Sequence, residues 1–361
     1  MVRLLGQKGS AVGMLAVGAG IAIGAATCVA QASGEPSTTL VNRDAIVYSA
    51  ATDKVYAVDQ THSAVWVIGA DGAAKSVKVG AGPESIAVNP VTGMVYVVSS
   101  ISHDVSVLDG KTDAVVAAVK TAARPFAIGL DEFTNKVYVS NIFSNMLTVI
   151  DGKTNTATNV KAGSQDAIAV DAKAKKVYLL GYESDSLTVL DSTNNEITKI
   201  PAGTMHQWGM ALHEAAGLLY VTHISDSSVS ALDLKTHHQE MIHVGAMPSA
   251  VAVNRETGEV YVANYVDGTV SVIDGGTGHV VATVTVGEHP EAIAVDAKKN
   301  LIAVANNQDN TVSFIDGKTR RIWKTMKAGE HPYALAIDEK AQKIYVANLS
   351  GKSFTVLNLE D

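Results

Sequence analysis

The stretch VGAMPSAVAVNRETGEVYVANYVDGTVSVIDGGTGHVVATV, residues 244–284, decides the fold of this 361-residue chain. Turn-forming residues such as Glu256-Thr257-Gly258 separate short runs that are rich in β-branched residues. The runs are Ala250–Val253, Val260–Ala263, Thr269–Ile273 and Val280–Val284. The stretch therefore predicts four short antiparallel strands joined by tight turns.

The same pattern recurs along the chain, and one position in the second strand marks its register. This position recurs at steps of 40, 42, 40, 42, 41, 42 and 42 residues. It is occupied by Tyr56, Tyr96, Tyr138, Tyr178, Tyr220, Tyr261, Ala303 and Tyr345. A regular period that contains four short strands is typical of β-propeller blades and not of helical solenoids.

Eight copies predict an all-β protein, a β-propeller of eight four-stranded antiparallel blades over residues 33–361. The last copy stops at Ser353–Leu357, before any fourth strand. Ser37–Val41 precedes the first inner strand, Ala45–Tyr48, and is expected to complete the last blade, so that no sheet edge stays open. Seven blades is the alternative if one copy is displaced.

The third strand ends in Asp in six copies, and Gly follows directly in four of them. Asp bonds to nearby backbone amides and Gly accepts a positive φ, which suits a tight turn into the fourth strand. We interpret these carboxylates as structural. They are Asp109, Asp151, Asp191, Asp233, Asp274 and Asp316.

Residues 1–32 have the composition of a signal peptide. A short basic start at Arg3 and Lys8 precedes the small apolar run Ala11–Ala26, and Ala30-Gln31-Ala32 provides a cleavage pattern. We expect cleavage near Ala32, a mature chain without a transmembrane segment, and a periplasmic or secreted location. An uncleaved anchor, or lipidation at Cys28, is the alternative.

Composition excludes several classes of chemistry. Cys28 is the only cysteine, so a chain cleaved at Ala32 has no disulfide, no Cys nucleophile and no thiolate metal ligand. The formal charge is −8, which disfavours a nucleic-acid partner.

The copies resemble the YVTN family of β-propeller repeats, also called YncE-like. The resemblance rests on Val260-Tyr261-Val262-Ala263-Asn264, Thr269–Asp274 and the linker Val286-Gly287-Glu288-His289-Pro290. It covers essentially the whole mature chain and implies an exported propeller whose ligands or partners are seldom assigned. His223 departs from the pattern, because Asn141, Asn264, Asn306 and Asn348 stand in its place in other copies.

Aligned copies also place distant residues at one face of the ring. The connections from the fourth to the first strand and from the second to the third strand share the face around the channel mouth. One linker slot on this face contains Asn42, Gly82, Arg124, Ser164, His206, Met247, His289 and His331. Imidazole and thioether groups suit copper or zinc, so His206, Met247, His289 and His331 form a candidate metal site. Capping of a strand by a common repeat residue is the structural alternative.

The slot two residues later contains carboxylates and aromatic side chains. It is occupied by Asp44, Glu84, Phe126, Asp166, Trp208, Ser249, Glu291 and Tyr333. Such a mouth suits a cationic or aromatic ligand. The candidate ligand-binding residues are Arg124, Phe126, Asp166, Trp208, His223, Glu291 and Tyr333, and Trp208 is exceptional among the copies. Solvation at the rim is the structural alternative.

Three functions remain open. The first is an exported binding scaffold whose unidentified protein or small ligand contacts the channel-mouth face. The second is a lactonase-like hydrolase with His206, His223, Asp166 and Glu291 for acid–base work. The third is a His/Met metal-binding propeller. Gly110-Lys111-Thr112 and its counterparts lack the upstream Gly of a P-loop, and no G-x-S-x-G motif occurs. Catalytic residues are therefore not assigned, and the scaffold is favoured.

Overall fold

The computed structural model describes residues 45–350 and 354–360, and within them it consists of strands and turns without a helix. The first four sheets contain β1 (Ile46–Ser49), β2 (Lys54–Asp59), β3 (Ala64–Gly69) and β4 (Ala74–Lys78); β5 (Pro83–Val88), β6 (Met94–Ser99), β7 (Asp104–Asp109) and β8 (Ala114–Lys120); β9 (Pro125–Asp131), β10 (Lys136–Asn141), β11 (Met146–Asp151) and β12 (Thr156–Lys161); and β13 (Ala167–Asp171), β14 (Lys176–Leu180), β15 (Ser186–Asp191) and β16 (Ile197–Pro201).

The other four sheets follow in chain order. They contain β17 (Gln207–His213), β18 (Leu218–His223), β19 (Ser228–Asp233) and β20 (Gln239–His243); β21 (Pro248–Val253), β22 (Glu259–Asn264), β23 (Thr269–Asp274) and β24 (His279–Thr285); β25 (Pro290–Asp296), β26 (Leu301–Asn306), β27 (Thr311–Asp316) and β28 (Arg321–Lys327); and β29 (Glu330–Asp338), β30 (Lys343–Ser350) and β31 (Phe354–Asn358). The sheets are blades I to VIII below.

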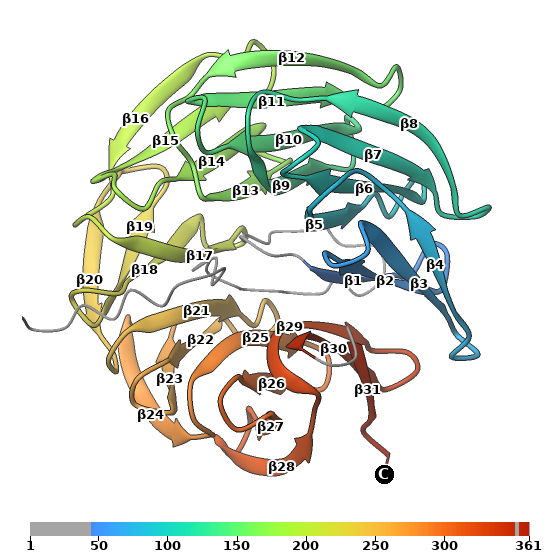
Figure 1. Cartoon of the computed structure of the whole chain (residues 1–361). Helices are drawn as coiled ribbons and strands as arrows, with labels where there is room; N and C mark the ends of the chain where they lie inside the picture. Colours follow the sequence, from blue (N-terminus) through green and yellow to red (C-terminus); the bar gives the residue numbers. More distant parts are fainter. Residues whose placement is uncertain (1–44, 351–353, 361) are drawn as a thin grey trace, which may run out of the picture.

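The blades form a closed ring (Figure 1). In each blade the strands pair antiparallel in chain order, with the first strand innermost. Each innermost strand contacts the innermost strands of both neighbouring blades, and β1 contacts β5 and β29. The predicted eight-bladed β-propeller is therefore confirmed. Blade VIII has three strands within the described residues, and the predicted closing strand Ser37–Val41 lies outside them.

The register tyrosines hold neighbouring blades together. Tyr56, Tyr96 and Tyr261 are fully buried, and each hydroxyl reaches the next blade. The Tyr56 hydroxyl donates to the Gly110 carbonyl at 3.2 Å, and the Tyr96 hydroxyl to Asn135 Oδ1 at 3.3 Å. An apolar ring that packs between two sheets and bonds at its polar end favours one blade-to-blade spacing around the whole ring.

Blade VII lacks this tyrosine, and the paired residue on the neighbouring strand fills the space of the missing ring. Ala303 pairs with Phe314, and Phe314 is fully buried. In the other copies Tyr faces Val in six pairs and Ala231 in one. The large side chain has moved to the neighbouring strand, so that the space between the sheets stays filled.

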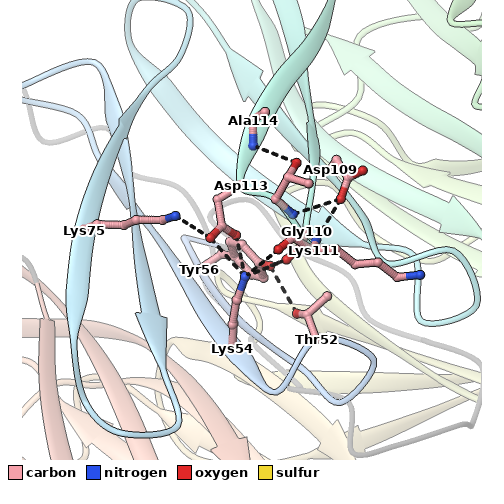
Figure 2. Close-up of polar contacts among 10 residues, drawn as sticks. Thr52, Lys54, Tyr56, Lys75, Asp109, Gly110, Lys111, Asp113 and Ala114 are labelled. Carbon is pink, nitrogen blue, oxygen red and sulfur yellow. Dashed lines mark hydrogen bonds and ion pairs between the residues drawn. The ribbon is translucent and has the colours of Figure 1, made fainter.

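On the face opposite the channel mouth, hydrogen bonds and ion pairs link neighbouring blades. Figure 2 shows Lys54 of blade I, whose ammonium group donates to the Gly110 carbonyl at 2.8 Å and contacts Asp113 at 2.8 Å. Lys75 adds a second ion pair to Asp113 at 2.6 Å. Asp109 accepts the backbone N–H groups of two turn residues, as the structural interpretation of the third-strand Asp residues predicts. The same turn pattern recurs at Asp151, Asp233, Asp274 and Asp316.

No helix among the described residues is long and apolar enough to cross a membrane.

The Ala303–Phe314 exchange predicts a coupled pair of substitutions. Phe314→Val should lower the free energy of unfolding by about 2 to 3 kcal/mol, because it leaves a cavity between blades. Ala303→Tyr alone should overfill the same space and cost about 1 to 3 kcal/mol. The double variant restores the Tyr–Val pair of other blades and should be more stable than either single variant. Urea unfolding measures the three values, and strict additivity of the two losses would contradict this packing.

Candidate functional site

Hydrogen bonds confirm which connections share the channel-mouth face. This face comprises the second-to-third strand connections and the fourth-to-first linkers. The backbone N–H of Arg124, in a linker, donates to His103 Nδ1 at 3.0 Å. Ser225 Oγ, in the β18–β19 connection, lies 2.9 Å from His206 Nδ1 in the linker before β17. Both contacts join the two kinds of connection, as the aligned copies predict.

The predicted metal slot is occupied by residues with an unusual backbone conformation. Gly82, Arg124, His206, Met247, His289 and His331 have φ between 52° and 65°. In blade IV Gly163 takes this conformation at 89°, while Ser164 does not. A left-handed residue lets the linker turn into the inner strand, so the slot has a structural role that is independent of any metal. Asn42 lies outside the described residues.

The three histidines of the candidate metal site have separate partners, and its methionine is exposed. His206 lies 5.0 Å from the ring of Tyr182, His289 stacks on Tyr265 at 4.3 Å, and His331 Nδ1 lies 3.2 Å from Asn307 Oδ1. Met247 is exposed. Across residues 45–350 and 354–360 no three His, Cys, Asp or Glu side chains converge in the way a metal ion requires. The copper or zinc site therefore stays a prediction, and this geometry adds no support to it.

Four residues of the carboxylate and aromatic slot are buried or form hydrogen bonds within the chain. Phe126 and Tyr333 are 8% and 5% exposed. Glu84 accepts hydrogen bonds from Ser100 and Gln60 at 2.9 and 3.0 Å. Further along the slot Ser249 donates to the Pro290 carbonyl at 2.8 Å. Asp44 is outside the described residues.

Glu291 influences the aromatic residue of the neighbouring connection. Burial raises the pKa of the Tyr265 phenol, and the negative charge of Glu291 raises it further. Tyr265 also stacks on His289. Glu291, Tyr265 and His289 therefore form a second group, on blades VI and VII, that is separate from the residues around Trp208.

The structure brings three of the predicted residues together around a fourth that the sequence analysis missed. The backbone N–H of Tyr182 donates to Asp166 Oδ2 at 2.7 Å, and its carbonyl accepts the backbone N–H of His206 at 2.8 Å. The Tyr182 ring lies 5.0 Å from the His206 ring and meets the Trp208 ring edge-on at 5.7 Å. We call Asp166, Tyr182, His206 and Trp208 the Tyr182 cluster.

A cleft of about 590 Å³ opens beside the Tyr182 cluster, between blades III and IV. Its walls come from the β10–β11 connection, the linker before β13 and the β14–β15 connection, and they include Phe143, Gln165, Asp166, Tyr182 and Asp185. The volume is within the range of small-molecule sites. Burial raises the pKa of the Asp166 carboxyl; the Tyr182 N–H opposes this shift and the charge of Glu183 adds to it.

Blades IV and V depart from the repeat at this location. Gln165 and Gln207 occupy the place of the prolines that begin the inner strand in blades II, III, VI, VII and VIII. Each side-chain N–H group donates to a linker carbonyl, Gln165 to Ala162 and Gln207 to Ala202. Both side chains are buried, and Oε1 of each has no hydrogen-bond partner. The linkers here are held by side chains and not by a fixed proline ring.

Arg124 and Phe143 extend the site toward blade III. The Arg124 guanidinium lies over the Phe143 ring, 5.6 Å from its centroid. Phe143 is largely exposed at the edge of the cleft. Arg124 therefore contacts the accessible rim, whereas Phe126 is buried below it.

His223 belongs to the hydrogen bonding of the fold. It is fully buried, and its Nε2 lies 2.9 Å from Ser230 Oγ. Asn264 and Asn306 make the same contact, through Nδ2 to Ser271 and Ser313 at 2.9 Å. Burial lowers the pKa of the His223 imidazole. The ring therefore substitutes for the repeat asparagine and is not exposed at the channel mouth.

Comparison with known proteins supports the fold. Residues 243–352 match the family model described as YNCE-like beta-propeller, which confirms over this part of the chain the resemblance predicted from the repeats. No curated protein matches the chain significantly. Because 1518 chains of solved structures match, the fold alone does not specify a function.

Two of these structures show that the folds are similar although the sequence identity is low. Hydrazine synthase of Kuenenia stuttgartiensis is 17% identical, with a TM-score of 0.62, and the alignment covers 77% of this chain and 95% of that chain. Dihydro-heme d1 dehydrogenase NirN, in complex with DHE, is 13% identical with a TM-score of 0.72, and the alignment covers 86% of this chain and 74% of that chain. Identities this low establish a common fold only.

The position of His223 predicts that asparagine can replace it. His223→Asn should lower the free energy of unfolding by no more than about 1 kcal/mol, because Asn reaches the same serine in other blades. His223→Leu should cost about 1 to 3 kcal/mol, since it leaves Ser230 Oγ buried without this partner.

The same variants predict a difference in acid. A histidine whose folded pKa is lowered stays neutral in the native state, while the unfolded chain binds a proton below about pH 6.5. Wild-type stability should therefore fall as the pH drops through this range, and His223→Asn should fall less. Chemical unfolding at pH 7.5 and pH 5 measures both effects. Equal acid sensitivity of the two proteins would contradict the assignment.

Proposed function

We propose that this YncE-like β-propeller is an exported binding scaffold, and that its ligand or partner contacts the channel-mouth face at the Tyr182 cluster. The observation that carries this proposal is the coincidence of the cluster, the 590 Å³ cleft and the two blades that depart from the repeat. A ring of similar blades offers eight equivalent positions, so a site is expected where the similarity ends.

The channel-mouth face also exposes single apolar side chains on several blades, which are Ile101, Phe143, Met205, Met247, Val266 and Leu349. Of these, Phe143 lines the cleft and adds apolar surface to the proposed site. A rigid disc with such a rim suits recognition without large rearrangement.

Export follows from the composition of residues 1–32, which lie outside the described residues. We expect N-terminal sequencing of the protein purified from its native cell envelope or culture medium to begin near Ser33. An Ala32→Leu variant should keep the longer chain, because the cleavage pattern requires small residues. A mature protein that starts at Met1 in the cytoplasmic fraction would contradict export.

A matched pair of tryptophan variants tests the binding face. Trp208→Ala removes a ring of the Tyr182 cluster, whereas Trp323→Ala removes an exposed ring on the outer strand β28. We expect Trp208→Ala to reduce capture of the partner from envelope extract about tenfold or more, since a buried aromatic anchor carries much of a binding energy. Trp323→Ala should capture as much as the wild type.

Quantitative mass spectrometry of the captured material compares the three proteins at equal loading, and circular dichroism checks their folding. The proposal fails if nothing is enriched reproducibly on wild type, or if both variants lose the partner equally.

A further inference from the structure

The cleft beside the Tyr182 cluster is lined mainly by acidic charged residues. Asp166, Glu183 and Asp185 line it, and Lys199 is the one basic residue among its described lining. Within residues 45–350 and 354–360 none of these three carboxylates forms an ion pair with a Lys, Arg or His side chain. A partly buried carboxylate without a cation is costly, so the cleft is electrostatically prepared for a positive ligand.

The same cleft has acceptor capacity that the chain does not use. Gln165 lines it and is 4% exposed, and its Oε1 has no hydrogen-bond partner. One carboxylate oxygen of Asp166 accepts the Tyr182 N–H at 2.7 Å, and the other forms no hydrogen bond within the described residues. An N–H donor of a ligand can reach this second Asp166 oxygen, whereas Gln165 Oε1 is shielded from solvent.

Aromatic rings complete the wall. Tyr182 and Phe143 both line the cleft. Phe143 already has the Arg124 guanidinium over its ring at 5.6 Å. This contact between Arg124 and Phe143 is an example, at the rim of the cleft, of the attraction between a cation and an aromatic ring.

The spacing of the carboxylates separates an organic cation from a metal ion. No three acidic or imidazole groups of the described chain converge as a single metal ion requires. The carboxylates instead line a cleft of about 590 Å³, a volume with room for a charged group on an aliphatic stem. An anionic ligand such as a nucleic-acid phosphate would meet like charge here.

We propose that the cleft between blades III and IV binds an organic cation, an ammonium or guanidinium group on an aliphatic stem, with Asp166 as the principal counter-charge. This rests on the proposed function and names the ligand class of its site. Such a cation is present both in free polyamines and in the Lys and Arg side chains of a basic peptide.

Isothermal titration calorimetry with the full-length mature protein tests the proposal. The probes are spermidine and an acetylated, amidated tri-lysine peptide, with potassium chloride and calcium chloride at matched ionic strength as controls. We expect at least one organic probe to bind with one-to-one stoichiometry and neither salt to do so. Preference for the peptide identifies a basic protein segment as the source, and preference for spermidine identifies a free polyamine.

Isosteric variants locate the site. Asp166→Asn keeps an oxygen for the Tyr182 N–H but removes the charge, and should weaken binding about tenfold, the loss typical of a charge-assisted hydrogen bond. Glu288→Gln removes an exposed charge of the same face outside the cleft, and should change the affinity less than about twofold. Thermal unfolding confirms that both variants fold.

Absence of binding by both organic probes, or equal affinity of Asp166→Asn and wild type, overturns the proposal. That failure is distinguishable from failure of the scaffold itself, because the tryptophan variants would still lose a captured partner of other chemistry.

Discussion

Each blade holds its neighbour through a large ring packed between two sheets, and the rest of the molecule depends on this contact. At Tyr56, Tyr96 and Tyr261 the hydroxyl also bonds to the turn of the next blade, so packing and hydrogen bonding together fix the spacing there. Because the ring closes on itself, an error in one contact would have to be absorbed by the others. Blade VII shows how strict the requirement is, since the loss of its tyrosine is matched by Phe314.

The two faces of the ring differ in how closely their connections are linked between blades. On the opposite face the turns are tied across blades, as Lys54 and Asp113 are, and their carboxylates cap backbone amides. On the channel-mouth face the connections vary more freely. Acidic residues accumulate there, at Glu84, Asp166, Glu183, Asp185, Asp226, Asp267, Glu288, Glu291, Asp309 and Glu330. The basic residues of the same face are fewer: Arg124 in a linker, and Lys78, Lys120, Lys161 and Lys327 at the ends of outer strands. The face whose connections vary thus carries many acidic groups, and a binding partner can be selected there by electrostatics.

The fold could be predicted from the sequence because a repeat reports its register many times over. The period placed the strands and the blades, and it placed Asp166, His206 and Trp208 near one another. It could not show that Phe126 is buried below the rim, because the exposure of a strand residue depends on its neighbours in other blades. Nor could it show that His223 serves as a substitute for asparagine, since only the contact with Ser230 reveals this. Tyr182 carries a signal in the repeat itself, because Tyr182 and Tyr265 are the two aromatic residues at their position in the second-to-third connections.

Hydrogen–deuterium exchange with and without spermidine tests most directly whether the cleft beside the Tyr182 cluster is the binding site. Slower exchange is predicted in peptides that cover residues 162–188 and 202–210, with little change in the turns around Lys54 and Asp113. Protection that is spread evenly over all eight blades, or confined to the opposite face, would contradict a site built where blades IV and V depart from the repeat.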